Sequence, residues 1–397
     1  MSPTTRREFL QATGLGAAGV ATGGALLAAT RGEALPNPKV DTALGATDGH
    51  MILPNRPGDA PVYIFGFVPV PFSASVSTLT NTYKGKAQTP APILAFRQDT
   101  DISLRLTNLG LVGRPDLADS HTVHWHGFRT PPALTDGVPE VSVAVPLQRQ
   151  FTYFYRPHDA GTYMYHCHFE DVEHVQMGMQ GIVLVRPSMG DRFAYNHAST
   201  AFDREFAILI DEIWTAPHDN GEQIQETIWT DYDPDYWTLN GRVYPQTLLP
   251  NDDPSLPNQP ISSLVQCNAG DKVLLRLANL GYEQHALQLP GIGMKVIGQD
   301  ATLLRNALSG ADLSYRTNTL YIGPGEARDV LFTAPAYSSD RPGGTGSRGP
   351  YNTYLFKNRD AKKLTNAGGA GLGGMATEVR VHQNALPAQT TPNETYA

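Results

Sequence analysis

The chain of 397 residues contains an internal repeat, which narrows its possible folds sharply. Two short sequences from the first half return nearly unchanged in the second half. They are residues 104–110 (LRLTNLG), which return as 275–281 (LRLANLG), and residues 162–165 (TYMY), which return as 353–356 (TYLF). Repetition over so long a distance indicates that one structural unit is built twice. We therefore expect two copies of one domain, at residues 55–190 and 205–385.

The repeated unit has the pattern of β-structure. Apolar and polar residues alternate with a period of two in several short segments, among them 102–106, 150–155 and 181–185. The 38 glycines and 31 prolines supply many turns, and no convincing helical periodicity follows the N-terminal leader. These features predict an all-β chain of two tandem Greek-key sandwiches. A Pro/Gly-rich approach to the first sandwich runs to about Pro71.

Composition excludes several classes of protein. The formal net charge of −8 argues against a nucleic-acid-binding surface. The two cysteines, Cys167 and Cys267, lie in different halves and cannot support a disulfide-rich scaffold. A Cys167 that takes part in chemistry is therefore expected to do so without a disulfide partner.

The N-terminus looks like an export signal of the twin-arginine type. The pair Arg6-Arg7 precedes Phe-Leu, and an uncharged run rich in alanine and glycine follows. Because this run has few large aliphatic residues, it would partition weakly into a bilayer. We expect a signal peptide at residues 1–34, no membrane span in the mature protein, and a periplasmic or otherwise extracytoplasmic location. The alternative is an amphipathic surface helix.

Histidine is concentrated in one region of the first half. Seven of the 12 histidines lie between His121 and His174, where an even distribution would place fewer than two. Such clustering is typical of a metal site.

Strand geometry sorts the candidate ligands into two sets, because side chains alternate between the two faces of a strand. In the sequence HTVHWHG at 121–127 the first histidine points away from the other two, and in HCH at 166–168 the cysteine points away from both histidines. The predicted sets are His121, Cys167, His174 and Met179 on one side, and His124, His126, His166 and His168 on the other.

The two sets suit different metal chemistry. Two histidines, one cysteine and a weak axial methionine are the ligands of a blue-copper electron-transfer centre. Zinc is the rival, although it rarely uses a thioether and a structural zinc site would favour more cysteines. The second set, which contains only imidazoles, suits copper, zinc or iron at positions open to solvent or substrate. Because Cys167 is bonded to both His166 and His168, an electron at the first set has a short through-bond route to the second.

On these motifs the sequence resembles the multicopper oxidases, a family that includes the laccases and, more distantly, the two-domain copper nitrite reductases. The matching motifs are H-x-x-H-x-H-G at 121–127, H-C-H at 166–168 with His174 and Met179 downstream, TDGVP at 135–139 and AGTY at 160–163. The resemblance implies two cupredoxin-like domains and copper as cofactor.

The resemblance also implies what each site residue does. The first set would bind type 1 copper, and the second set would supply half of a type 2/type 3 trinuclear cluster. Asp136 matches an acidic residue near the oxygen-reducing copper and is a candidate proton relay. The implied activity is transfer of electrons from a small reductant or redox protein to dioxygen. Two-domain members of the family suggest a homotrimer, in which the first domain of one chain faces the second domain of the next.

The second half lacks the four histidines that such a cluster takes from it. Alignment of the repeats places Gln288 and Pro290 opposite the last two histidines of HTVHWHG, and it places Lys357, Asn358 and Arg359 opposite HCH. The four remaining imidazoles could hold one copper, or a pair completed by exogenous ligands. Alternatively, Lys357 and Arg359 occupy the metal space and leave a protein with one copper.

Three classes of function therefore remain open, of which an oxidase is the one we favour. The others are an electron carrier with type 1 copper alone, and a copper-handling or scaffold protein derived from an oxidase. Asp136 could also be only a turn residue before Gly137. The acidic residues Glu170, Asp171 and Glu173 are either a docking patch for the donor or a solvated loop.

Overall fold

The computed structural model describes residues 39–129, 131–383 and 385–396. The predicted export signal at residues 1–34 lies outside this part of the chain. Within it, no helix is long and apolar enough to cross a membrane.

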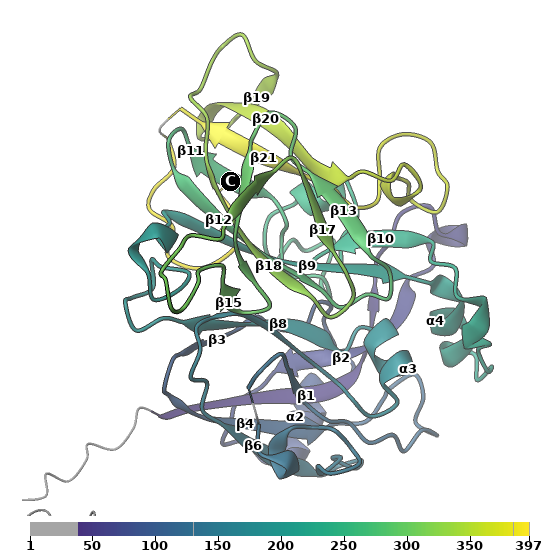
Figure 1. The fold of residues 1–397 in the computed structure, drawn as a ribbon. Helices are drawn as coiled ribbons and strands as arrows, with labels where there is room; N and C mark the ends of the chain where they lie inside the picture. Colours follow the sequence, from purple (N-terminus) through teal and green to yellow (C-terminus); the bar gives the residue numbers. More distant parts are fainter. Residues whose placement is uncertain (1–38, 130, 384, 397) are drawn as a thin grey trace, which may run out of the picture. The chain divides into compact units, whose positions relative to one another are not determined.

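The strands of the first half form two four-stranded sheets (Figure 1). One buried cluster contains side chains from both sheets, among them Phe65, Leu104, Trp125 and Val183, so the sheets form a β-sandwich. In the order of their hydrogen-bonded neighbours, the sheets are β2 (Val62–Pro69), β1 (Lys39–Met51), β4 (Asp101–Asn108) and β6 (Gln150–Tyr155), and β3 (Leu94–Arg97), β8 (Gln180–Arg186), β7 (Gly161–His166) and β5 (His124–His126).

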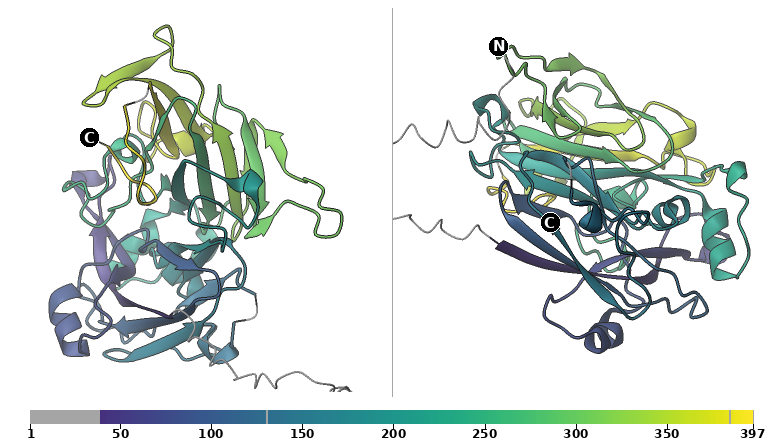
Figure 2. Two further views of the ribbon diagram at one scale, coloured as in Figure 1. Left: turned by 90° about the vertical axis from the view of Figure 1, so that its left-hand side faces the viewer. Right: turned by 60° about the horizontal axis from the view of Figure 1, so that its bottom comes forward.

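The strands of the second half form another pair of sheets around a core of their own, and Figure 2 distinguishes the two halves by colour. One sheet is β10 (Tyr236–Leu239), β9 (Arg204–Ile213), β12 (Lys272–Asn279), β18 (Ala327–Thr333), β14 (Met294–Gln299) and β15 (Thr302–Leu303), with β16 (Tyr315–Thr317) paired to β14. The other is β11 (Val265–Asn268), β21 (Ala376–His382), β20 (Gly349–Asn358), β13 (His285–Gln288) and β17 (Thr319–Ile322), with β19 (Gly343–Gly346) paired to β20. The predicted class, all-β with two tandem sandwiches, is confirmed.

The two sandwiches share one topology. β4 lies between a parallel neighbour, β1, and an antiparallel neighbour, β6, just as β12 lies between β9 and β18. β7 pairs with β8 and β5, just as β20 pairs with β21 and β13. The repeated sequences fall on these equivalent strands, β4 with β12 and β7 with β20. The strands β14 to β17 and β19 are additions of the second half.

The segment that we interpreted as an approach to the first domain contributes two strands instead. β1 lies between β2 and β4, and the first sheet therefore extends N-terminal to the predicted domain limit at residue 55. β1 was not predicted from the sequence, because glycine and aspartate interrupt the alternation of apolar and polar residues along it. Asp48, which resembles a turn residue, is buried and accepts hydrogen bonds from Tyr63 Oη at 2.9 Å and from the Gly113 N–H at 2.7 Å.

Short helical segments connect the strands. They are the α-helices α2 (Val76–Tyr83), α3 (Asp171–Gln176) and α4 (Thr215–Glu222), and the 3₁₀ turns η1 (Pro57–Asp59), η2 (Ala133–Thr135), η3 (Ala198–Thr200), η4 (Trp229–Asp231), η5 (Gln246–Leu248) and η6 (Lys362–Leu364). Two of them occupy equivalent places in the repeat. α3 lies between β7 and β8 and carries the predicted ligand His174, and η6 lies between β20 and β21.

The sheet that contains β7 and β8 is buried on both faces. Tyr163 and Tyr165 of β7 point into the first core. Met164 between them, together with Leu184 of β8, packs against second-half residues such as Leu209 of β9. Figure 1 shows β8 next to β9 at this contact. Side chains of β7 therefore alternate between the core of the first half and the contact with the second half.

A buried network of charges joins the halves at the same contact. Arg276 of β12 donates hydrogen bonds to Glu205 Oε1 at 2.5 Å and to Thr162 Oγ1 of β7 at 3.1 Å. Arg186 of β8 donates to Glu205 at 2.6 Å, and Thr162 donates to Asp329 at 2.5 Å. Burial alone would raise the pKa of Glu205, but the two guanidinium groups hold that pKa below its usual value. The Glu205 carboxylate is therefore charged and depends on its arginine partners.

We expect Arg276→Met to lower the free energy of unfolding by about 3–5 kcal/mol, because it removes the guanidinium that faces the buried Asp329 and leaves Glu205 with Arg186 alone. Arg97→Met is the matched control, since Arg97 forms an exposed ion pair with Asp191 and such a pair is worth less than about 1 kcal/mol. Urea unfolding followed by circular dichroism measures both. Equal losses in the two variants would show that the network does not hold the halves together.

Candidate metal centre

The described structure gathers the predicted site residues into two groups. The cysteine group comprises His121, Cys167, His174 and Met179, and the histidine group comprises His124, His126, His166 and His168. In the cysteine group, the candidate ligand atoms of the cysteine and both histidines lie within 4.8 Å of one another. In the histidine group, those of the first three histidines do the same.

The alternation of side chains along β7 puts the two groups on opposite faces. Cys167 directly follows β7, and its side chain belongs to the first core together with Tyr163. His166 ends β7 on the same side as Met164, which faces the second half. Because β5 pairs with β7, His124 lies opposite His166. This separation of the groups is the one that strand geometry predicts.

The donor atoms of the cysteine group converge on one buried point. The Sγ of Cys167 lies 3.3 Å from Nδ1 of His174 and 4.0 Å from Nδ1 of His121. These three residues are almost completely buried. The backbone N–H of Thr122 donates to the sulfur at 3.4 Å. Two imidazole nitrogens and a thiolate in this arrangement fit copper or zinc.

The loop between β7 and β8 positions the last two residues of the cysteine group. The N–H of Cys167 donates to the carbonyl of Met179 at 3.0 Å, and the N–H of Met179 donates to the carbonyl of His174 at 3.0 Å. Gly178, with φ of 115°, makes the turn that links them. These bonds fix the fully buried Met179 beside the end of the cysteine strand.

The electrostatics of the cysteine group favour a bound cation. Burial, followed by the neighbouring His174, lowers the pKa of His121 well below its usual value. Burial also opposes protonation of His174, but the Cys167 thiolate and the Asp119 carboxylate raise its pKa to about 10. The Oδ2 of Asp119 lies 3.7 Å from Nε2 of His174. A buried negative field that holds a proton this strongly also attracts a metal cation.

Backbone carbonyls fix the tautomers of three residues in the histidine group. The contacts are His124 Nδ1 to the Asp136 carbonyl at 2.9 Å, His126 Nε2 to the Gly325 carbonyl at 3.1 Å, and His166 Nδ1 to the Cys167 carbonyl at 2.8 Å. A carbonyl oxygen only accepts, so each of these nitrogens carries a proton. The other nitrogen of each ring keeps its lone pair, as in metal-binding histidines.

Two of these lone pairs face each other. Nδ1 of His126 and Nε2 of His166 are 3.2 Å apart. Burial lowers the pKa of His126 and lowers that of His166 to about 3, so neither ring carries a second proton near neutral pH. Two lone pairs at this distance repel each other unless a cation contacts both. The histidine group therefore fits a metal ion.

His168 and Asp136 lie at the edge of the histidine group. The ring centroids of His168 and His124 are 5.1 Å apart. The Oδ1 of Asp136 lies 3.3 Å from Nδ1 of His124. Gly137 follows with φ of 82°, and a Cβ at this position would meet the Val123 carbonyl at 2.1 Å. The turn therefore requires glycine, and it holds Asp136 against the histidine strand.

The second half presents no histidine to this group within the described chain, in agreement with the sequence alignment. Gln288 pairs with Lys357 in the second half just as His124 pairs with His166 in the first. Among the described residues, neither Lys357 nor Arg359 forms a hydrogen bond or ion pair with the histidine group.

Two residues that contact the groups, Asp119 and Gly325, were not predicted from the sequence. Asp119 precedes His121 by two residues and so shares its side of an extended chain, which is a signal that could have found it. Gly325 carries no such signal, because its contact with His126 joins the two halves and depends on their packing.

A cavity of about 310 Å³ opens beside the cysteine group. Its lining includes Asp119, Glu170, Glu173, Glu226, Arg114 and Trp229. Burial raises the pKa of Glu173, and Arg114 is engaged by Asp116 at 2.8 Å. Two of the three acidic residues singled out between Cys167 and His174 thus line an acidic cavity, and Asp119 of the same lining lies 3.7 Å from Nε2 of His174.

The region that carries the histidine and cysteine motifs is similar to known proteins. Residues 72–190 match the family model described as Multicopper oxidase. This part of the chain is similar to a multicopper oxidase domain. Laccase-12 of Arabidopsis thaliana is 28% identical over 219 residues, which cover 54% of this chain and 34% of that protein. The chain spans about a third of the length of this laccase and of Laccase-5 from the same plant.

Solved structures have the same fold over nearly the whole chain. The blue copper oxidase from Nitrosomonas europaea superposes with a TM-score of 0.63 at 21% identity, covering 86% of each chain. The copper nitrite reductase from the same organism gives a TM-score of 0.60 at 15% identity, covering 89% of this chain and 98% of that one. The predicted resemblance to both kinds of protein is confirmed, and at these identities it concerns the fold.

We expect Cys167→Ser to bind one copper fewer per chain and to lose the intense visible absorption of a copper thiolate, because a hydroxyl is a poor ligand for this metal. Cys267→Ser is the matched control, because Cys267 of β11 is equally buried and burial raises its pKa. Among the described residues, Cys267 belongs to no group of candidate metal ligands. Elemental analysis and absorption spectra measure the outcome. Unchanged copper content in Cys167→Ser would exclude the cysteine group as a metal site.

Proposed function

We propose that this protein is a copper-dependent oxidoreductase that accepts electrons at the cysteine group and delivers them to dioxygen at the histidine group. The observation that carries the proposal is the covalent link between the groups. Cys167 belongs to one group, and its chain neighbour His166 belongs to the other. A strand that places a thiolate and an imidazole on opposite faces joins two metal sites by a few bonds.

The proposed ligands have distinct tasks. His121, Cys167, His174 and Met179 would hold type 1 copper, and His124, His126, His166 and His168 would hold a second copper site. Bound copper would supply the one-electron chemistry that this function needs. The protein contributes a dry site for the thiolate, carbonyl contacts that aim the imidazole lone pairs, and a rigid sheet that fixes both groups.

The acidic cavity beside His174 is the proposed entry point for electrons. The carboxylates that line the cavity attract a cationic donor. One of them, Asp119, has its Oδ2 3.7 Å from Nε2 of His174. A metal cation or a small cationic reductant suits this charge better than an anionic donor.

We expect a cationic donor such as hexaammineruthenium(II) to have a lower KM than the anionic hexacyanoferrate(II). Replacing Glu170 or Glu226 by glutamine should raise the KM for the cation about twofold to fivefold, as expected for loss of one exposed charge. Glu140→Gln is the control, since Glu140 is exposed and does not line the cavity. High salt should abolish the difference. Equal effects of the three variants would place donor entry elsewhere.

Asp136 is the proposed proton relay. Reduction of dioxygen consumes protons as well as electrons, and this carboxylate lies 3.3 Å from Nδ1 of His124 at the edge of the histidine group. Asp136→Asn should retain copper and still take electrons from the donor. We expect it to slow oxygen consumption, and an unchanged rate would reduce Asp136 to a turn residue.

The central experiment is to measure copper per chain, paramagnetic resonance and oxygen uptake on one sample. The proposal expects a blue type 1 signal, a second copper signal, and oxygen uptake with good donors. His166→Ala should remove the second signal and oxygen uptake, because it deletes one of the two facing lone pairs. One copper per chain with no oxygen uptake would instead indicate an electron carrier.

We keep the predicted assembly, location and domain limits as part of the proposal. A homotrimer would bring the second half of a neighbouring chain to the histidine group, to which the described second half of the same chain offers the Gly325 carbonyl as a hydrogen-bond acceptor. The Arg6-Arg7 pair supports twin-arginine export to the periplasm, and the repeat supports domains at 55–190 and 205–385, to the first of which the structure adds β1. Molar mass in solution tests the trimer, and the cellular location of an Arg6→Lys/Arg7→Lys variant tests export.

A further inference from the structure

The second half contains a turn with the same backbone hydrogen bonds as the cysteine group. In the first half these bonds are Cys167 N–H to Met179 O at 3.0 Å and Met179 N–H to His174 O at 3.0 Å. In the second half they are Asn358 N–H to Met375 O at 2.9 Å and Met375 N–H to Lys363 O at 2.9 Å. The backbone therefore places Asn358, Lys363 and Met375 at the positions of Cys167, His174 and Met179.

The segment that carries the carboxylate and the first histidine of the site also has the same arrangement in both halves. An asparagine at the end of the repeated strand anchors the same segment in each half, through Asn108 Nδ2 to Asp119 O at 2.7 Å and Asn279 Nδ2 to Glu283 O at 2.8 Å. Glu283 thus takes the place of Asp119, and His285 takes the place of His121. The carboxylate faces the same partner position in both halves, since Asp119 is 3.7 Å from His174 and Glu283 is 2.8 Å from Lys363.

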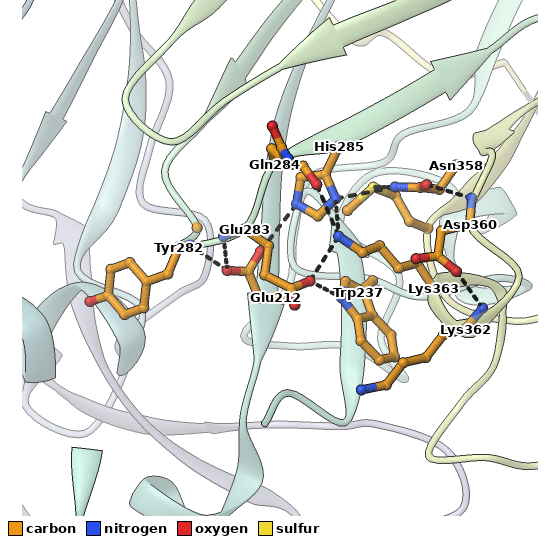
Figure 3. Close-up of polar contacts among 12 residues, drawn as sticks. Glu212, Trp237, Tyr282, Glu283, Gln284, His285, Asn358, Asp360, Lys362 and Lys363 are labelled. Carbon is orange, nitrogen blue, oxygen red and sulfur yellow. Dashed lines mark hydrogen bonds and ion pairs between the residues drawn. The ribbon is translucent and has the colours of Figure 1, made fainter. Parts of the chain in front are cut away.

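The ammonium group of Lys363 lies inside this second-half site (Figure 3). Its Nζ is 3.3 Å from Nδ1 of His285, 3.0 Å from the carbonyl of Gln284 and 2.8 Å from Oε2 of Glu283. Lys363 is 9% exposed, so these protein atoms replace most of the water around its charge. A buried ammonium needs such partners, because an unpaired one would be very costly.

His285 is oriented as a metal-binding histidine would be. Its Nε2 lies 3.2 Å from Oε2 of the fully buried Glu212, which accepts the ring proton (Figure 3). The lone pair of Nδ1 therefore points toward Lys363. A carboxylate that fixes one ring nitrogen and leaves the other as a donor is the usual arrangement around metal ligands.

Asn358 stands where the cysteine group has Cys167. Its Oδ1 accepts the N–H of Asp360 at 2.9 Å, which fixes the orientation of the amide. Its Nδ2 then lies 3.1 Å from Nδ1 of His285 and 3.3 Å from Sδ of Met375. The imidazole and thioether donors of a soft-metal site are thus both present, and N–H groups occupy the space between them.

We propose that the second half retains a metal site of the cysteine-group type in which the ammonium of Lys363 serves as a tethered cation and excludes copper. The site lies within the second sandwich and is separate from the histidine group. Its donors would take a soft ion such as Cu(I) or Ag(I) if the lysine were absent.

The test compares copper binding in three variants built in the Cys167→Ser background, which lacks the thiolate of the first half. Asn358→Cys adds a thiolate and keeps Lys363. Asn358→Cys/Lys363→His adds the same thiolate and replaces the ammonium by an imidazole, which reproduces the donors of the cysteine group. The third variant adds His285→Ala to this pair as the matched control.

We expect the pair Asn358→Cys/Lys363→His to bind one more copper per chain than its background and to gain a copper-thiolate absorption band. Asn358→Cys alone and the His285→Ala control should gain neither. An equal gain in Asn358→Cys alone would show that the ammonium does not occupy the cation position. A folded pair with no gain would show that the site is not a metal site.

A simpler variant applies if the pair does not fold. Asn358→Ala/Lys363→Ala should bind one more Ag(I) than Asn358→Ala, because both N–H groups between the donors are then removed. Adding His285→Ala should return the count to that of Asn358→Ala. Equal counts in Asn358→Ala and Asn358→Ala/Lys363→Ala would overturn the proposal. Each experiment measures the metal ions bound in excess of those bound by the parent chain. The outcome therefore does not depend on whether the proposed oxidase activity is confirmed.

Discussion

The arrangement of this protein depends on one strand, β7, that is buried on both faces. Alternate side chains of β7 enter the core of the first sandwich and the contact with the second. At its end this alternation sends Cys167 to one side and His166 to the other. Two groups of ligands therefore arise from adjacent residues and stay separated by the thickness of a sheet. Any change that slips the register of β7 by one residue would exchange the faces and destroy both groups together.

A second theme is the need for buried cations. The cysteine group surrounds its centre with a thiolate and a nearby carboxylate, and the histidine group turns two lone pairs toward each other. The equivalent site of the second half has a neutral amide, Asn358, in place of the thiolate, and the ammonium of Lys363 balances the charge of its carboxylate, Glu283. The two halves thus differ in charge: the first surrounds its site with negative groups, and the second contains a cation of its own.

Much of the fold and the candidate site could be predicted from local patterns. The repeat identified the two sandwiches, because equivalent strands keep similar sequences, and a period of two sorted the ligands onto their faces. Strand β1 was missed, because its burial on both sides and its glycines remove the alternation that marks a strand. The Gly325 contact was missed for a different reason, since it joins segments 199 residues apart and no local pattern encodes such packing.

The sequence by itself determined which residue types are available, their order and their parity, because alternation along a strand is a property of the backbone. It therefore predicted the membership of the two groups and the absence of histidines opposite the histidine group in the second half. Only the tertiary structure decided which ring nitrogens keep lone pairs, which carboxylate faces His174, and where the side chain of Lys363 ends. These outcomes depend on contacts between distant segments, and their energies come from burial and charge rather than from local sequence.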